Sequence, residues 1–224
     1  MKAILEDIKS NKGTSSFHAF RYQVPYFQFK WHYHPEFELT YIVKGKGYRI
    51  VGDSYEYFTD GDLVLLGSNL PHTWSGKSND NVDSDAVVIQ FSNEFIAPFL
   101  ELNESISIKN MLENSIRGIS FEADLSIVSK IINLSTANGM DRIINLISIL
   151  DDLSKKQTKR IASNAFHIVV SKKNEMRINK VCLYIQNNFY NKISFRYILL
   201  FLKSTWKLII RRKKYKLVNL PKIH

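Results

Sequence analysis

The sequence predicts an α+β protein in which an N-terminal antiparallel β-barrel of the jelly-roll type is followed by a helical hairpin and a short helical C-terminal region. Three observations favour this class. Short aromatic and β-branched stretches alternate with turns over the first part of the chain, apolar residues then recur at helical spacing, and the end of the chain is strongly basic. We therefore expect a barrel in residues 1–95, a hairpin in 96–155, a linker in 156–173 and a further helical region in 174–224.

The barrel is predicted from short strands separated by turn residues. Aromatic residues alternate with polar ones over residues 27–34, which is the two-residue period of a strand. Residues 48–58 are typical of a hairpin whose turn is Gly52-Asp53. Residues 63–66 and 86–91 are short apolar strands of the kind that a barrel buries.

Two amphipathic helices are predicted after the barrel. Apolar residues recur with the i, i+3, i+4, i+7 spacing in residues 125–132 and again in 143–153. Asn138-Gly139 provides a helix stop between them. The apolar faces of this hairpin either cover the barrel or pair with a second subunit, and the sequence leaves both alternatives open.

The charge of the chain is unevenly distributed. The 224 residues carry a formal charge of +10, but residues 171–224 hold 14 Lys and Arg against one acid, whereas residues 1–170 have a net charge of −3. This asymmetry is expected of a chain whose partner is a nucleic acid or an anionic surface.

Cysteine usage and hydropathy indicate the compartment. Cys182 is the single cysteine of the chain, which excludes an intrachain disulfide framework and fits a reducing cytosol. The first residues include acids where a signal peptide needs an apolar stretch, and the chain contains no run of 18 apolar residues. We therefore expect a cytoplasmic protein with no transmembrane segment.

Four residues of metal-ligand type occur at a spacing that can bring them together. His32 and His34 are two residues apart, so on a strand both side chains project from the same face. Glu38 has the same parity, and His72 follows one further strand. Three imidazoles and a carboxylate can hold a divalent metal and leave positions open. The alternative is an organic effector that is hydrogen-bonded by the same side chains.

These residues resemble the two cupin motifs. Residues 32–45 read His-x-His-x3-Glu-x6-Gly, which resembles the first motif, and residues 61–72 read Gly-x10-His, which resembles the second. Three positions depart from the usual proline, glycine and asparagine of the second motif, namely Gly67, Asn69 and Gly76. The resemblance implies a cupin-like barrel with a site for Fe, Mn, Ni or Zn.

Longer stretches resemble the sensor domain of AraC-type transcription regulators. They are residues 31–39 (Trp-His-Tyr-His-Pro-Glu-Phe-Glu-Leu), 61–66 and 69–72. The hairpin, the linker and a helix expected at 177–191 continue the resemblance to about residue 194. The resemblance implies that the barrel senses a small molecule such as a sugar or an organic acid, that the hairpin forms a homodimer, and that a C-terminal domain with two helix-turn-helix units binds DNA.

The resemblance stops after Ser194. The following residues contain no turn between two helices, which a helix-turn-helix requires. We therefore expect a truncated or frame-shifted DNA-binding domain and impaired specific DNA binding. Three alternatives are open for the basic tail. It has no selected function, it contacts DNA weakly and without sequence preference, or it lies on an anionic membrane as an amphipathic helix. The candidate DNA contacts are Arg211, Arg212, Lys213 and Lys214.

Three further residues are candidate effector contacts. Trp31 and Trp74 suit stacking on a ring-shaped effector, and Arg49 suits pairing with an anionic one. Each also has an ordinary structural interpretation, since the tryptophans are typical of a barrel core and the arginine of a solvated strand.

The alternative from a different class is a stand-alone metal-dependent cupin enzyme, a dioxygenase or an isomerase. Such enzymes use a metal site of three histidines and one glutamate with open coordination positions. The sequence shows no second acid–base pair at a defined spacing, and the helices after the barrel match a regulator. We therefore expect a protein without catalytic residues, the sensing and dimerisation part of an AraC-type regulator.

Overall fold

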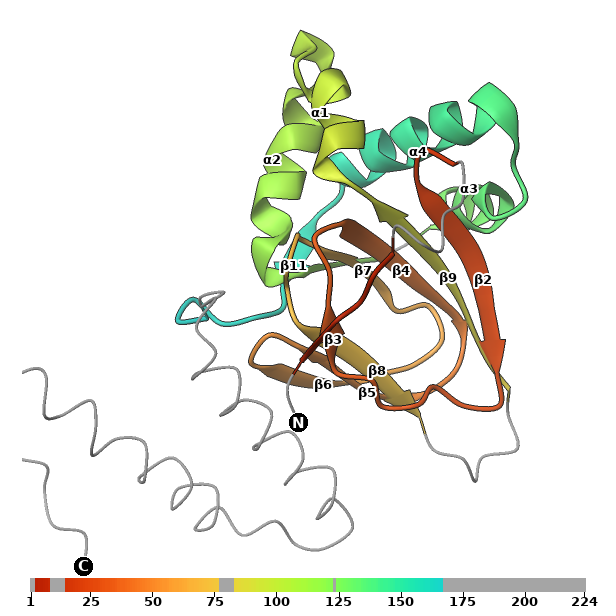
Figure 1. The fold of residues 1–224 in the computed structure, drawn as a ribbon, viewed down its shortest axis with the longest axis vertical. Coiled ribbons are helices and arrows are strands. Elements are labelled where there is room, and N and C mark those ends of the chain that lie inside the picture. The colour runs from red at the N-terminus through yellow and green to blue at the C-terminus, as the bar shows by residue number, and fades with distance from the viewer. Residues whose placement is uncertain (1–2, 9–14, 77–82, 123, 167–224) are drawn as a thin grey trace, which may run out of the picture. The chain divides into compact units, whose positions relative to one another are not determined.

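Two β-sheets form the walls of an open barrel in the computed structural model, which describes residues 3–8, 15–76, 83–122 and 124–166 (Figure 1). The first sheet has the order β1 (Ile4–Leu5), β3 (His32–Tyr33), β8 (His72–Gly76), β5 (Gly47–Val51) and β6 (Ser54–Phe58). The second has the order β11 (Thr158–Arg160), β10 (Ile119–Phe121), β7 (Leu63–Leu66), β4 (Phe37–Lys44), β9 (Ser84–Phe91) and β2 (His18–Val24). The predicted α+β class is confirmed, and the region expected at 174–224 lies outside the described residues.

Strand β4 shows how the sequence divides side chains between two buried layers. Glu38 and Thr40 project into the barrel with Ile42, which packs there in a cluster with Phe58 of the opposite sheet. Residues of the other parity, such as Tyr41, project from the outer face of the same strand, where helices cover them. The middle of the strand is therefore buried on both faces, and its buried residues Glu38 and Thr40 face the barrel interior.

Six helical segments follow β9 among the described residues. They are α1 (Asn93–Leu100), the short 3-10 segment Asn103–Ser105, α2 (Ile106–Asn114), the 3-10 segment Ser115–Arg117, α3 (Leu125–Leu134) and α4 (Gly139–Ser154). Ser92 Oγ accepts a hydrogen bond from the backbone N of Phe95 at 3.2 Å, which caps α1. No helix among these described segments is long and apolar enough to cross a membrane.

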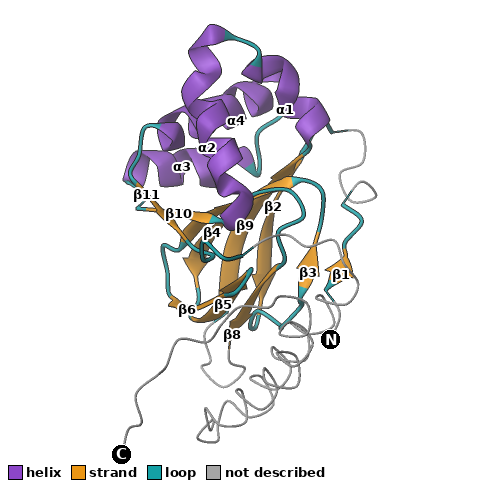
Figure 2. Ribbon diagram, turned by 90° about the vertical axis from the view of Figure 1, so that its left-hand side faces the viewer, coloured by secondary structure: helices purple, strands orange, loops and turns teal. Residues whose placement is uncertain are grey.

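The predicted hairpin corresponds to α3 and α4, and its apolar faces are buried within the domain. Ile131 of α3 and Leu150 of α4 belong to one cluster with Leu65 and Ile89 of the second sheet. Arg142 of α4 also donates to the carbonyl oxygen of Phe17 at 3.0 Å, next to β2. Of the two alternatives left open by the sequence, these faces therefore cover the barrel (Figure 2).

The expectation of a linker in residues 156–173 is wrong for its described part. Thr158–Arg160 form the edge strand β11, which pairs with β10, and Phe166 packs against the barrel wall near Gly52. The reason is that an edge strand with exposed polar side chains on both faces has the composition of a linker, while its backbone still pairs.

Candidate metal centre and effector recess

Three strands bring the predicted ligand residues together inside the barrel. His32 on β3 pairs in register with His72 on β8, and their rings lie 4.2 Å apart between centroids. His34 follows β3, and Glu38 is the second residue of β4. One ligand atom from each of His32, His34, Glu38 and His72 lies within 4.8 Å of every other. We call these four residues the histidine cluster.

Backbone carbonyl groups orient all three imidazole rings. The Nδ1 atom of His32 donates to the carbonyl oxygen of Lys30 at 2.7 Å, and that of His72 donates to Leu70 at 2.8 Å. The Nδ1 atom of His34 lies 3.2 Å from the carbonyl oxygen of Glu36. Because a carbonyl oxygen only accepts, each Nδ1 atom carries the proton, and each Nε2 atom is directed to the centre as the potential ligand.

Glu38 is held by a set of hydrogen bonds although it is only 4% exposed. Its carboxylate accepts from Thr40 Oγ1 at 2.7 Å, from Gln90 Nε2 at 2.8 Å and from His34 Nε2 at 3.0 Å. Burial raises the pKa of Glu38, but the neighbouring imidazole of His72 and the hydrogen bond from His34 outweigh it and hold the pKa well below its ordinary value. The cluster therefore contains a buried carboxylate that stays ionised.

The histidines divide into one that is readily protonated and one that is not. Burial and then the neighbouring His72 lower the pKa of His32 to about 4. Burial also lowers the pKa of His34, but the hydrogen bond to Glu38 and its charge outweigh this and raise the pKa above the ordinary value. The hydrogen bond between His34 and Glu38 therefore favours the charged form of both groups.

The residues fit a divalent metal ion. The Nε2 atom of His72 is buried without a hydrogen-bond partner among the described residues, and it lies 3.6 Å from Oε1 of Glu38. Ligand atoms that share an ion at about 2.1 Å lie roughly 3–4.2 Å apart, so small adjustments would bring all four within reach of one ion. An unpaired buried acceptor beside a carboxylate is the environment that a cation stabilises.

Glu6 is a member of the site that the sequence analysis missed. Its Oε2 atom lies 3.1 Å from Nε2 of His32, and its Oε1 atom accepts from Nζ of Lys30 at 2.5 Å. The residue reaches the cluster because β1 pairs with β3 in parallel, with Ile4 opposite His32. Glu6 stands at no motif spacing from the histidines, so only the strand pairing reveals it.

Arg49 and Trp74, two of the predicted effector contacts, meet at one carboxylate. Asp62 accepts from Nη1 of Arg49 at 2.6 Å and from Nε1 of Trp74 at 3.1 Å. Arg49 is 4% exposed, so its interpretation as a solvated strand residue is wrong. The cause is the position of Arg49 on β5, directly opposite Trp74 of β8 and Glu56 of β6. Trp31 is also buried, immediately before β3.

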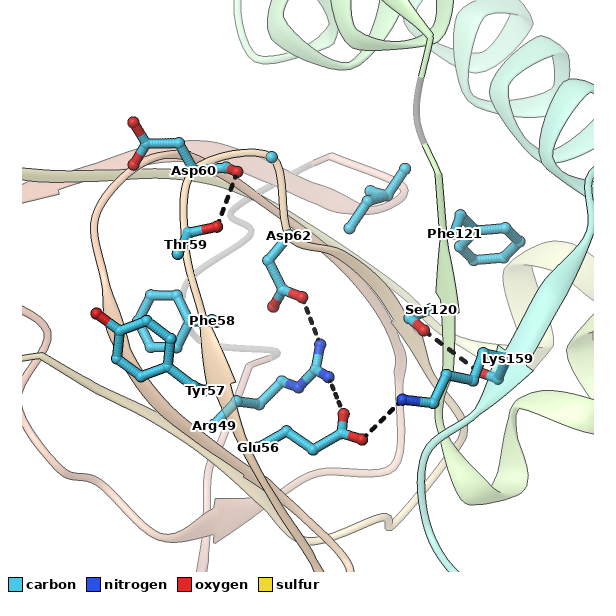
Figure 3. A pocket seen from close by; sticks show the side chains of 12 residues that line it. Arg49, Glu56, Tyr57, Phe58, Thr59, Asp60, Asp62, Ser120, Phe121 and Lys159 are labelled. Carbon is cyan, nitrogen blue, oxygen red and sulfur yellow. Dashed lines mark hydrogen bonds and ion pairs between the residues drawn. The ribbon is translucent and has the colours of Figure 1, made fainter.

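A recess of about 560 Å³ opens beside Arg49 (Figure 3). Strands β5, β6, β7, β10 and β11 and the turn between β6 and β7 supply its lining. Its charged residues are Arg49, Glu56, Asp60, Asp62 and Lys159. The recess is thus separate from the residues of the histidine cluster. The predicted DNA contacts Arg211, Arg212, Lys213 and Lys214 lie outside the described residues.

Two sheets enclose a three-histidine, one-glutamate cluster and helices cover the outer face of one sheet, which is a cupin-like α+β arrangement. The sequence profile of the AraC-like ligand binding domain matches residues 15–135, which is more than half of the chain. The chain therefore belongs to the AraC-like ligand binding domain family.

Solved structures of two kinds are similar to this chain. ToxT from Vibrio cholerae O395, bound to (E)-4-(8-methylnaphthalen-1-yl)but-3-enoic acid, is 14% identical with a TM-score of 0.45, and the match covers 90% of this chain and 78% of ToxT. A cupin 2 conserved barrel domain protein from Salinispora arenicola CNS-205 is 17% identical with a TM-score of 0.32, and the match covers 39% of this chain and 72% of that one. No curated protein matches the chain significantly.

Proposed function

We propose that this chain is the effector-sensing part of an AraC-type transcription regulator and that its histidine cluster binds a divalent ion such as Fe, Mn, Ni or Zn. Membership of the AraC-like ligand binding domain family supports the sensor role. The unpartnered, buried Nε2 atom of His72 is the observation that carries the metal assignment. When bound, the ion supplies a Lewis-acidic position that an oxygen atom of a small effector can occupy.

Each residue of the cluster has a defined task in this proposal. The three histidines bind through Nε2, because the carbonyl groups at Nδ1 fix their rings. Glu38 supplies the negative charge that a divalent ion requires, and Thr40 and Gln90 hold its carboxylate in place. Glu6 covers Nε2 of His32 from the N-terminal strand, so it either adds a further ligand or is displaced when an effector enters.

The remaining elements suit a regulator that works as a homodimer in the cytoplasm, where it meets DNA. The inner faces of α3 and α4 pack against the barrel, so we place the dimer contact on their outer faces. Leu125, Met140 and Ile144 are 86%, 65% and 58% exposed there. Sedimentation of wild type and Ile144→Glu tests this contact, and equal monomer content in both would contradict it.

Calorimetric titration of tag-free, chelator-treated protein with Zn²⁺, Ni²⁺ and Mn²⁺ tests the metal assignment. We expect binding of about one ion per chain, as for a single three-histidine site. His72→Ala removes the unpartnered ligand and abolishes binding, whereas Asp151→Asn removes a carboxylate of α4 outside the cluster and leaves binding unchanged. Binding that survives His72→Ala would contradict the assignment.

The regulator role has a separate test. The 224-residue protein, with or without bound metal, is mixed with genomic DNA fragments and washed at increasing salt. The fragments that stay bound are then sequenced. A small set of enriched fragments that depends on metal supports regulation, while uniform recovery that vanishes with salt indicates phosphate contacts alone.

A cupin enzyme is the second candidate function, and the donor set of the histidine cluster is the observation that favours it. The metal-loaded protein would then convert a phenolic or a keto substrate, with product formation followed by chromatography. Turnover that is lost in Glu38→Gln would favour this alternative over a sensor.

A further inference from the structure

The recess beside Arg49 contains a carboxylate that two cations hold from opposite sides. Oε2 of Glu56 accepts from Nη2 of Arg49 at 2.6 Å, and Oε1 of Glu56 accepts from Nζ of Lys159 at 3.0 Å (Figure 3). Each oxygen atom of this carboxylate therefore binds one cation. A carboxylic acid from solution would make the same two charge-assisted hydrogen bonds.

Arg49 is held more firmly than either Glu56 or Lys159. Arg49 is buried and is anchored by Asp62, and its Nε atom is buried without a hydrogen-bond partner among the described residues. The side chain of Glu56 is 30% exposed, and that of Lys159 is 72% exposed. Glu56 can therefore turn into water without burying its charge, while Arg49 stays in position.

We propose that this recess is a second binding site, distinct from the histidine cluster, for a small hydrophilic carboxylic acid whose carboxylate replaces Glu56 between Arg49 and Lys159. The volume of about 560 Å³ lies within the range of about 300–1,000 Å³ typical of small-molecule sites. Thr59 and Ser120 also line the recess, and their hydroxyl groups suit a hydroxylated acid better than a long apolar one.

Glu56 acts in this site as a built-in competitor. It is tethered next to both cations, and a tethered group competes at a high effective concentration. Binding of the acid also breaks the ion pair between Glu56 of β6 and Lys159 of β11, which joins the two sheets. The ligand then contacts Lys159 in place of Glu56.

Titration of the full chain with tartrate, a hydroxylated dicarboxylic acid, tests the proposal by calorimetry and by amide chemical shifts. Glu56→Ala removes the competitor, and we expect tartrate to bind about tenfold more tightly than to wild type. Lys159→Ala weakens binding several-fold in both backgrounds. Lys155→Ala, which removes a similarly exposed lysine from the C-terminal end of α4, leaves the affinity unchanged.

The two sites are distinguished by repeating the titration with and without bound metal. Tartrate affinity that is the same in both states, tighter in Glu56→Ala and weaker in Lys159→Ala supports a separate acid site. If tartrate binds only when metal is present, and its affinity is the same in wild type, Glu56→Ala and Lys159→Ala, the acid binds at the histidine cluster and the proposal is overturned. Absence of binding in wild type and in Glu56→Ala overturns it as well.

Discussion

Nε2 of His34 lies 3.0 Å from Oε2 of Glu38, and both side chains are buried inside the barrel. A buried ion pair of this kind is costly unless the remaining lone pairs are satisfied. Thr40 and Gln90 satisfy those of Glu38. The pair is thus maintained by neighbours from two strands, which is typical of a centre that is organised for binding.

Glu38→Gln is expected to weaken divalent metal binding by more than about a hundredfold, the upper end of what loss of an outer-shell partner costs. The amide keeps the size of the side chain but loses the charge that balances the ion. Competition with a chromogenic chelator measures the affinity, and Glu56→Gln, which removes a carboxylate outside the histidine cluster, serves as the control. Equal affinities in the two variants would refute a role for Glu38 as a ligand.

Thr40→Val is expected to weaken metal binding by about tenfold, because the hydroxyl group positions Oε1 of Glu38. Thr40→Ser keeps the hydroxyl group and restores the affinity. Denaturant unfolding separates this effect from general destabilisation, since loss of one hydrogen bond lowers the free energy of unfolding by only about 1 kcal/mol. A Ser variant that binds as weakly as the Val variant would argue against positioning by the hydroxyl group.

Arg49→Met is expected to lower the free energy of unfolding by about 3–5 kcal/mol, because it leaves the carboxylate of Asp62 buried without its cation. Burial already raises the pKa of Asp62 above 3.8, and removal of Arg49 raises it further. A carboxyl group with a raised pKa stabilises the folded state below its unfolded pKa, and this contribution is lost as pH rises through the folded pKa.

The loss in Arg49→Met is therefore expected to be larger at about pH 7.5 than at about pH 4.5. Arg49→Met/Asp62→Asn removes both charges and recovers part of the stability. Urea unfolding at the two pH values measures this, and a loss that is independent of pH would show that Asp62 does not remain buried and unpaired.

Leu150→Ala is expected to lower the free energy of unfolding by about 2–5 kcal/mol, because Leu150 of α4 is fully buried against the second sheet. Ile106→Ala on α2, away from the proposed dimer contact, changes it by no more than about 0.5 kcal/mol, since Ile106 is 64% exposed. The loss in Leu150→Ala does not depend on protein concentration if α4 packs within its own domain. A loss that shrinks as concentration rises would instead indicate packing between subunits.

The strands and the placement of His32 beside His34 follow from the sequence because both depend on local patterns, whereas His72 is expected from the resemblance to the second cupin motif. The two-residue period places His32 and His34 on one face, and the turn at Gly52 carries a φ of +60° that glycine adopts without strain. The spacing from His34 to Glu38 likewise matches a short turn and the start of β4.

Contacts that depend on pairing between distant segments do not follow from such patterns. Glu6 reaches His32 because β1 adds to the edge of the first sheet, and Lys159 reaches Glu56 because β11 adds to the edge of the second. Edge strands of two or three residues have no readable period. The sequence also suggests that the side chain of Arg49 is exposed to solvent, because its partner Asp62 lies on a turn 13 positions away.

X-ray absorption spectroscopy at the metal edge of tag-free, metal-loaded protein tests whether the histidine cluster holds the ion. We expect about one ion per chain, with imidazole nitrogen from three histidines and carboxylate oxygen as ligands at about 2.0–2.2 Å. The imidazole contribution decreases in His72→Ala. A spectrum with oxygen ligands alone, or a metal content below about a tenth of an ion per chain under saturating conditions, would contradict a metal centre at the histidine cluster.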